Sequence, residues 1–317
     1  MDKVHVIVNP FSARGKTIER WETIKEIIRH HFNEYKAIFT EKPKQATEIA
    51  RDSLQQGADI IIGVGGDGTL NEITNGYFHD QTEKVINPDA SLGIVPSGTG
   101  SDFIRYLKIP GDFKRSVALI KNSRNRKIDV GKITFNIPGK EGGSASPFSR
   151  FFINVADFGL GAEVVKTLHS TQGGKHGALS YYTGLLSTIR KYKSKPVSIT
   201  IDDKETISGS FLIGAVANGR IFGGGMQIAP GAEPDDGLFD LVLVGDMSRF
   251  QIIKDSRRLY TGTIASHPRV IVKRARNIKV FPVDESKGQV NIEYDGEMGD
   301  TLPAEFQVLT QQVNLRI

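Results

Sequence analysis

Strands that alternate with helices constrain the fold of this 317-residue chain more than any other feature. In its first 128 residues, short apolar runs rich in β-branched residues recur at 3–10, 35–40, 58–66 and 91–98. Helical patterns lie between these runs, and the one over 17–32 places Trp21, Ile24 and Ile28 on one apolar face. Strands that are apolar along their whole length are typical of a parallel sheet covered by helices. We therefore expect residues 1–128 to form a doubly wound, mostly parallel α/β domain.

The pattern changes near residue 129. From there on, most of the chain consists of short apolar segments, several with period-two alternation, separated by turns that contain glycine or proline. This pattern favours an antiparallel β-sandwich over 129–303, interrupted by helices near 175–191 and 248–260. The segment 138–148 reads as a flexible hairpin loop. The last residues, 304–317, are expected to form one or more strands that pack back toward the first domain.

Three loops rich in small residues follow strands of the first domain. They are "NPFSA" (9–13), "GVGGDGTLNE" (63–72) and "PSGTGSDF" (96–103). Open α/β sheets bind ligands at the carboxyl edge of their strands, where all three loops should lie. The glycines of the second loop precede a helix, and the free N–H groups of a helix start favour phosphate. Thr69, with Glu72 three residues later, also fits a capping box for that helix.

Two common nucleotide motifs do not explain these loops. Gly63, Gly65 and Gly68 have the spacing of a dinucleotide-binding fingerprint, but their loop follows the third strand, and Asp67 would repel a pyrophosphate. The "GKT" that begins at Gly15 resembles the end of a Walker A loop, but proline stands where that motif needs its first glycine. Asp67 would fit such a loop only if a metal ion or a proton transfer made use of its carboxylate.

Five segments, in order along almost the whole chain, carry a resemblance to a known family. They are "GGDGTLNE" (65–72), "PSGTGSDF" (96–103), "RKIDVG" (126–131), "APGAEPDDGLFDLVLV" (229–244) and "EYDGE" (293–297). Together they resemble the bacterial diacylglycerol-kinase-like lipid kinases, which share the G-G-D-G-T loop with NAD kinases, sphingosine kinases and phosphofructokinases. The resemblance implies a first domain like that of NAD kinase and phosphofructokinase, a sandwich domain for the lipid, and ATP in the cleft between them. It further implies Mg²⁺-dependent transfer of the ATP γ-phosphate to a lipid hydroxyl, with diacylglycerol giving phosphatidic acid.

The resemblance also implies roles for individual residues. It assigns nucleotide contacts to Asn9, Pro10, Phe11, Ser12, Ala13, Thr40, Gly66, Asp67, Gly68, Thr69, Leu70, Asn71, Glu72, Thr99 and Asp102. It assigns a magnesium site to the Asp236 carboxylate with the backbone carbonyls of Glu233 and Leu238, and it matches Asp129 to an acid at the domain junction, which we group with the metal ligands. The catalytic candidates are Glu297, Asp295 and Asp67, with Glu297 the first choice as base. One position departs from the family, because Ser101 replaces the usual asparagine.

The chemistry of the "YDGE" segment suits a kinase. A lipid hydroxyl has a high pKa, so a carboxylate within hydrogen-bond reach can accept its proton as transfer proceeds. On a strand, Asp295 and Glu297 would face the same side, and Gly296 would leave room for a substrate. A hairpin turn with solvated acids is the alternative interpretation, as an ordinary turn is for "PDDG". The glycine-rich segment 217–230 reads equally as a loop at a lipid entrance or as a bend in the sandwich.

Charge and composition bear on partners and location. The net charge of +5 and the pI of about 9.2 are compatible with a phosphorylated ligand, an anionic membrane or a solvated basic surface. The cations are scattered, without an arginine-rich arm or zinc-finger spacing, so no nucleic-acid partner is expected. No signal peptide or apolar run of membrane-spanning length is recognisable, and cysteine is absent. We expect a cytoplasmic protein that meets its lipid transiently at the inner membrane face, with a homodimer left open.

Two other functions remain open from the sequence. A NAD kinase would share the G-G-D-G-T loop and would phosphorylate soluble NAD. A nucleotide- or lipid-binding regulator would bind its ligands without turnover, although the retained acids Asp67, Asp236 and Glu297 argue against it.

Overall fold

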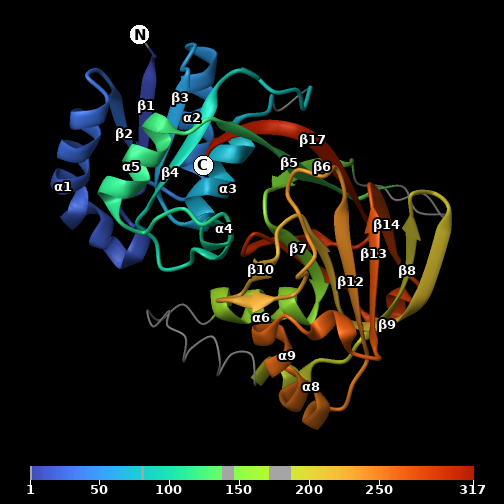
Figure 1. Ribbon diagram of the computed structural model, residues 1–317. Helices are drawn as coiled ribbons and strands as arrows, with labels where there is room; N and C mark the ends of the chain where they lie inside the picture. Colours follow the sequence, from blue (N-terminus) through green and yellow to red (C-terminus); the bar gives the residue numbers. More distant parts are fainter. Residues whose placement is uncertain (1, 80–81, 138–145, 171–186) are drawn as a thin grey trace. The chain divides into compact units, whose positions relative to one another are not determined.

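The computed structural model describes residues 2–79, 82–137, 146–170 and 187–317 (Figure 1). The chain divides into two compact units, which we call unit 1 (Met1–Val130 with Thr310–Ile317) and unit 2 (Gly131–Leu309). Within the described ranges, every helix is too short or too polar to span a lipid bilayer.

Unit 1 is built on a parallel sheet. Its strands are β1 (Val4–Val8), β2 (Lys36–Phe39), β3 (Ile60–Gly65), β4 (Ser91–Pro96) and the end of β17 (Ala304–Arg316). Their order in space is β2-β1-β3-β4-β17, and all neighbouring pairs are parallel. Every residue of β1 and β3 is buried, as expected for strands covered on both faces.

Helices cover both faces of this sheet. α1 (Lys16–His31) and α5 (Phe113–Asn122) pack on one face, where Trp21 and Val117 join Val6 in a hydrophobic cluster. α2 (Gln45–Gln55) and α3 (Asp67–Gly76) pack against each other on the opposite face. A Cβ at Gly63 would lie 2.7 Å from Ile73 Cδ1, so β3 needs a glycine where α3 crosses it.

Unit 2 consists mainly of antiparallel strands. They are β5 (Asn125–Phe135, which begins in unit 1), β6 (Phe148–Phe152), β7 (Val155–Gly159), β8 (Lys195–Ile201), β9 (Glu205–Ala217), β12 (Phe239–Gly245), β13 (Val270–Ala275), β14 (Asn277–Pro282), β15 (Asn291–Tyr294) and β16 (Glu297–Thr301). The first half of β9 pairs with β8, and its second half pairs with β7 and β12. Along β8, Val197, Ile199 and Ile201 alternate into the core. The predicted fold class, a parallel α/β sheet followed by antiparallel strands, is confirmed.

The helices of unit 2 differ in part from the prediction. The helix expected near 248–260 is present as two, α8 (Arg249–Asp255) and α9 (Arg257–Thr261). Ser256 lies at the break and donates its hydroxyl to Ile253 O (2.8 Å), a bond that often bends helices. α6 (Leu160–Ser170) is a helix that the strand-like pattern did not predict. The helix expected over 175–191 and the hairpin loop over 138–148 lie largely outside the described residues.

Short elements complete the two units. They are η1 (Ser12–Gly15) and α4 (Asp102–Tyr106) in unit 1, and the hairpin of β10 (Ile221–Phe222) with β11 (Met226–Gln227), η2 (Ile264–Ser266) and η3 (Glu285–Lys287) in unit 2.

Candidate active site

In unit 1, the glycine-rich loops after β3 and β4 pack backbone to backbone. A Cβ on Gly66 would lie 2.7 Å from Gly100 O, and a Cβ on Gly98 would lie 2.5 Å from Gly66 Cα. The N–H of Asp67 donates to Gly100 O (3.2 Å), which links the two loops further. Only glycine allows this approach, so the two loops form a single surface.

The outer side of this surface is open. A Cβ on Gly68 or on Gly100 would meet no atom within 4 Å, and neither residue has a positive φ. Contacts within the described chain therefore do not explain glycine at these two positions. Thr99, which stands between Gly98 and Gly100, is exposed. Gly68 lies in the first turn of the ten-residue helix α3. Open space beside the N–H groups of a helix start fits a phosphate group.

The carboxylate of Asp67 anchors the second of these loops. It accepts hydrogen bonds from the N–H groups of Asp102 (2.5 Å), Phe103 (3.2 Å) and Ile104 (3.4 Å), which form the first turn of α4. Burial raises the pKa of Asp67, the three backbone hydrogen bonds oppose the rise, and the charge of Asp102 adds to it. The carboxylate expected to engage a metal ion or a proton thus serves the backbone of α4. Ser101, at the N-cap of α4, makes no capping bond of its own to the described chain, since Asp67 supplies that cap.

The capping box expected at Thr69 and Glu72 is wrong. α3 begins three residues earlier than predicted, at Asp67, with Gly66 as its N-cap. Thr69 Oγ1 instead accepts a hydrogen bond from Asn9 Nδ2 (3.1 Å), which ties the loop after β1 to α3. The Glu72 carboxylate accepts from two N–H groups at the start of α2, both at 3.1 Å, and so caps a different helix. Both side chains join neighbouring elements.

A chain of hydroxyl groups, which sequence reasoning missed, joins the loops after β1 and β4. Thr17 Oγ1 lies 2.5 Å from Ser12 Oγ and 2.8 Å from Ser97 Oγ, and it also donates to Ser97 O (2.9 Å). Thr17 and Ser97 are buried. The sequence signal for this hydroxyl chain is Thr17 in the "GKT" segment, which does not complete a Walker A motif.

The other predicted nucleotide positions differ in accessibility. Phe11 is 63% exposed, while Pro10, Ser12 and Ala13 are partly exposed. The buried side chains among them are those of Thr40, Leu70, Asn71 and Asp102. The buried side chains stabilise the loops, so a nucleotide would meet mainly backbone and the exposed residues.

Asp129 and the Asp236 segment were the predicted metal positions. Asp129 is fully buried in β5 and accepts a hydrogen bond from the N–H of Gln311 (2.7 Å), where β17 bends with a φ of 53°. Among the described residues, no group of three or more His, Cys, Asp or Glu side chains is placed to hold a metal ion.

The Asp236 carboxylate is already paired. One of its oxygens forms an ion pair with Arg274, and the other accepts from the N–H of Leu238 (3.1 Å). The Glu233 carboxylate pairs with Arg220. One carboxylate and two carbonyls are oxygen ligands of the kind that Mg²⁺ takes. As placed, however, they do not fit a metal ion unless Arg274 moves away, and the metal site stays a prediction.

The "YDGE" segment forms a tight hairpin in unit 2. Asp295 (φ 49°) and Gly296 (φ 86°) are the turn residues between β15 and β16, and Tyr294 pairs with Glu297. The expectation that Asp295 and Glu297 face one side of a strand is therefore wrong. The Asp295 carboxylate accepts from three successive N–H groups of residues 153–155, at 2.8, 3.0 and 3.1 Å. Glu297 is partly exposed, and its carboxylate makes no hydrogen bond or ion pair with any residue that the structure describes.

Two buried acids lie behind this hairpin and were not singled out from the sequence. Asp157 of β7 lies directly opposite Glu293 of β15, and both side chains are buried. Asp157 accepts from the N–H of Ala162 (2.9 Å) in the first turn of α6, and Glu293 accepts from the N–H of Gly296 (2.9 Å) in the hairpin turn. Burial raises the pKa of Asp157 to about 6, and burial together with the neighbouring Asp157 charge raises the pKa of Glu293 well above its usual value. The buried pair therefore holds its protons to a higher pH than exposed carboxyl groups do.

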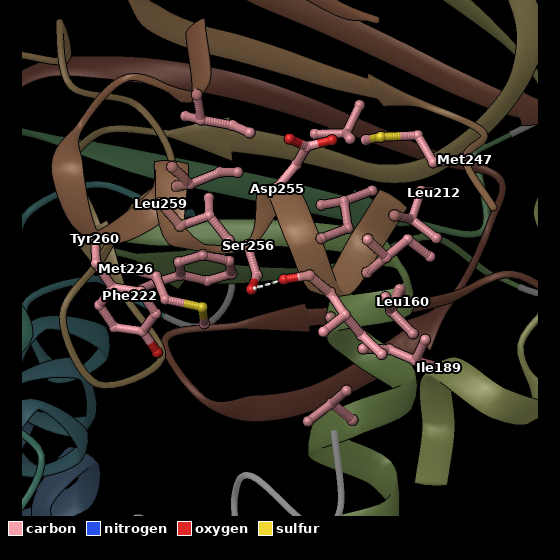
Figure 2. Close-up of a pocket in the computed structure, with 18 residues that line it drawn as sticks. Leu160, Ile189, Leu212, Phe222, Met226, Met247, Asp255, Ser256, Leu259 and Tyr260 are labelled. Atoms are coloured by element: carbon pink, nitrogen blue, oxygen red, sulfur yellow. Dashed lines mark hydrogen bonds between the residues drawn. The ribbon is translucent and has the colours of Figure 1, made fainter. Parts of the chain in front are cut away.

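Unit 2 also contains an apolar cavity of about 150 Å³ (Figure 2). Its walls come from α6, β9, β12, the β10–β11 hairpin and the α8–α9 helices. Leu160, Leu212, Phe222, Met226 and Leu259 are among the apolar side chains that line it (Figure 2). The glycine-rich segment 217–230 thus contributes Phe222 and Met226 to an apolar cavity, which agrees with one of its two interpretations.

Comparisons with known proteins cover both units. The diacylglycerol kinase catalytic domain family matches residues 3–133, and the YegS C-terminal NAD kinase beta sandwich-like domain family matches residues 154–317. A diacylglycerol kinase of Staphylococcus saprophyticus is 32% identical, over 99% of this chain and 94% of that protein. A diacylglycerol kinase of Staphylococcus aureus strain Newman is 29% identical, over 99% of this chain and 91% of that protein. A solved structure of a candidate diacylglycerol kinase from Bacillus anthracis has a TM-score of 0.76 and 25% identity, over 99% and 96% of the two chains.

The similarity thus runs the full length of the chain, and its two halves match the two domains of one kind of enzyme. The glycine-rich surface of unit 1 and the apolar cavity of unit 2 suit a phosphate donor and an apolar acceptor. The chain belongs to the bacterial diacylglycerol-kinase-like family of lipid kinases.

Proposed function

We propose that this protein transfers the γ-phosphate of ATP to the free hydroxyl of diacylglycerol, producing ADP and phosphatidic acid. The observation that carries the lipid acceptor is the apolar cavity of unit 2. An apolar cavity of about this size can hold a small apolar group without water, so a segment of an acyl chain would fit it. A soluble dinucleotide such as NAD would gain little binding free energy from an apolar cavity. NAD is therefore the weaker candidate for the acceptor.

The donor would bind at the glycine-rich surface of unit 1. The open space at Gly68 and Gly100 lets phosphate oxygens approach backbone N–H groups, and Asp67 keeps the second loop in place through α4. A magnesium ion that enters with ATP would neutralise charge on the phosphates. The Asp236 segment is not needed for this role, and no step of the proposal depends on it.

Glu297 is the base in this proposal. Its carboxylate would accept the proton of the lipid hydroxyl while that oxygen forms its bond to the γ-phosphorus. The bond between the γ-phosphorus and the oxygen bridging to the β-phosphate breaks, and ADP leaves with that oxygen. Asp295 is a poor candidate for the same task, because three backbone N–H groups already occupy its oxygens.

The direct test is a transfer assay with ATP labelled at the γ-phosphate and a panel of acceptors. Diacylglycerol, a monoacylglycerol, a sphingoid base and a glycolipid would be offered in mixed micelles, and NAD in solution. We expect label in the organic extract that co-migrates with phosphatidic acid, with the Glu297→Gln variant inactive but folded. Label on NAD alone would make the protein a soluble-acceptor kinase. ATP binding without transfer to any acceptor would point to a regulator.

A further inference from the structure

The outer surface of helices α8 and α9 carries large apolar side chains in an exposed position. Of the large apolar residues that the structure describes, Phe250 is the most exposed, at 76%. Ile253 (54%) and Tyr260 (45%) lie within ten residues of it. Isolated exposed apolar side chains are ordinary, but three on two consecutive short helices form a patch. We call Phe250, Ile253 and Tyr260 the α8–α9 patch.

Exposed cations accompany this patch. Arg249, Lys254 and Arg257 are exposed on the same two helices, and none of them forms an ion pair with another described residue. The sole acid between residues 248 and 261 is Asp255. Its carboxylate lies beside Arg258 and His267. The exposed charge on the two helices is therefore positive.

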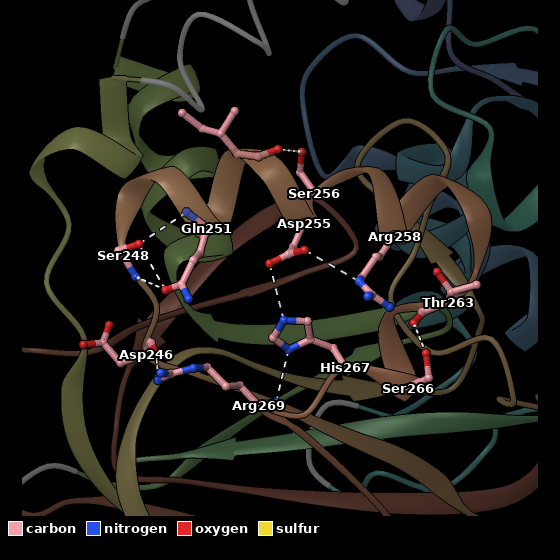
Figure 3. Close-up of polar contacts among 11 residues, drawn as sticks. Asp246, Ser248, Gln251, Asp255, Ser256, Arg258, Thr263, Ser266, His267 and Arg269 are labelled. Carbon is pink, nitrogen blue, oxygen red and sulfur yellow. Dashed lines mark hydrogen bonds and ion pairs between the residues drawn. The ribbon is translucent and has the colours of Figure 1, made fainter.

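The contacts of Asp255 hold the helices to the body of unit 2 (Figure 3). Its carboxylate lies 3.4 Å from His267 Nε2 and 3.7 Å from Arg258 Nε. The N–H of Arg269 donates to His267 Nδ1 (3.1 Å), which leaves the Nε2 proton to face Asp255. At the start of α8, Ser248 and Gln251 form a capping box. These contacts fix which face of the helices points outward.

The same helices form one wall of the apolar cavity. Ile252 and Leu259 line the cavity from the inner side. Ile253 and Tyr260 also line it, although they are about half exposed. Ile253 and Tyr260 therefore belong both to the wall of the cavity and to the α8–α9 patch.

We propose that the α8–α9 patch docks on an anionic phospholipid bilayer, with Phe250 and Ile253 inserted among the lipids. Apolar side chains flanked by Lys and Arg are the usual composition of an interfacial membrane helix. A negatively charged leaflet matches the cations, whereas a second copy of this basic face would repel them. Docked in this way, the part of the cavity wall that carries Ile253 and Tyr260 faces the lipid layer. A chain can then pass from bilayer to cavity without crossing water.

The test measures binding of the full chain to sedimented vesicles of phosphatidylcholine, with and without phosphatidylglycerol. We expect binding mainly to the anionic vesicles. Each cation near such a surface is worth roughly a fivefold gain in partitioning, so the triple variant Arg249→Glu, Lys254→Glu, Arg257→Glu should bind at least roughly a hundredfold less. Phe250→Ser should weaken binding roughly tenfold or more. A matched control replaces Val283, which is 58% exposed elsewhere on unit 2, with serine and should bind normally.

A second measurement reports insertion directly. The chain has one tryptophan, Trp21, which is 7% exposed and so has a fixed apolar environment. Phe250→Trp adds a second, exposed one, and its emission should shift to the blue when anionic vesicles are added. Retained binding by the triple variant and Phe250→Ser, or no shift from Phe250→Trp, would overturn the proposal. So would a change from dimer to monomer in the Phe250→Ser variant, which would make the patch a protein interface.

This inference is independent of the phosphoryl transfer proposed above, because vesicle binding needs no ATP. If transfer fails for every acceptor while binding depends on the patch, only the kinase assignment falls. If transfer occurs, Phe250→Ser should retain activity on a short-chain diacylglycerol in solution and lose it on the same lipid class in vesicles. Equal loss on both substrates would count against docking.

Discussion

Replacing Asp295 with asparagine should destabilise unit 2 without removing the chemistry. The carboxylate accepts three backbone N–H groups, and the residue occupies a turn position with a φ of 49°. Asparagine tolerates this backbone conformation, so the variant changes the hydrogen bonds without straining the turn. A single amide oxygen can accept two of the three donors at most, and the new NH₂ group faces a donor instead of an acceptor.

The size of the effect follows from these bonds. A hydrogen bond to a charged group contributes about 1.5–3 kcal/mol, and a stranded buried donor costs a similar amount. Asp295 is partly exposed, so the low end of this range applies to each bond. With one bond lost and two weakened, the unfolding free energy of unit 2 should fall by about 2–3 kcal/mol. For a unit of this size, such a loss lowers Tm by roughly 5–10 °C.

Glu297→Gln is the matched variant in the same hairpin. Glu297 makes no hydrogen bond or ion pair with the described chain, so its replacement should change the unfolding free energy by less than about 0.5 kcal/mol. It should instead reduce phosphoryl transfer by roughly 10²–10⁴-fold, the usual contribution of a general base. Urea unfolding and transfer activity per folded molecule, measured on both variants, give the comparison.

The opposite pattern would refute this reasoning. If Asp295→Asn unfolded like the parent but lost transfer by the factor expected of a base, Asp295 would take part in the chemistry. If Glu297→Gln kept full activity at a temperature where both proteins are folded, the base would lie elsewhere.

Four further outcomes are expected in the two units. In the buried pair of Asp157 and Glu293, both pKa values are raised, so the folded state binds more protons than the unfolded state above about pH 4. The urea midpoint should therefore fall as the pH rises from about 4 through 6, and Glu293→Gln should flatten this dependence; an equally steep fall in the variant would contradict it. Asp67→Asn should loosen the loop before α4, costing about 1 kcal/mol in urea unfolding and roughly tenfold in ATP affinity by calorimetry. Glu72→Ala should destabilise unit 1 by about 1 kcal/mol through loss of the α2 cap, while ATP affinity per folded molecule stays unchanged. Gly68→Ala should keep or raise stability, because alanine is the better helix former, yet weaken ATP binding by filling the open space; unchanged affinity would mean that no phosphate lies there.

The fold was predictable because its signals are local and repeated. Strands such as β1 and β3 are buried at every position and apolar at nearly all of them, as expected for a sheet covered on both faces. The position of the glycine-rich loops at the ends of those strands followed from the same pattern. α6 was not predictable, because apolar segments of this length fit a helix or a strand equally well. The break at Ser256 was not predictable either, because serine within a helical pattern is no strong stop signal.

The roles of the acids were predictable only in part, because their partners are distant in sequence. Thr69 and Glu72 have the spacing of a capping box, but Glu72 finds its donors in α2, 26 and 28 residues away. Asp67 bonds to residues 35–37 positions further on. At Asp295, the Asp-Gly pair is a hairpin signal. It outweighs the period-two spacing that predicted a continuous strand through Asp295 and Glu297. For Thr69, Glu72, Asp67 and Asp295, local rules therefore misassigned what the side chains contact.

These contacts distinguish two roles among the acids of the glycine-rich loops and of the hairpin between β15 and β16. A carboxylate whose oxygens are held by several backbone N–H groups fixes a loop well, but few of its lone pairs remain free for a substrate hydroxyl. Asp67, Glu72 and Asp295 are of this kind, each joining a loop to the start of another segment. Glu297 differs because the described chain offers its carboxylate no donor. Loss of activity in variants of the first three would thus arise from displaced loops, and the conservative replacement should recover part of it. At Glu297, an amide of the same size should recover none.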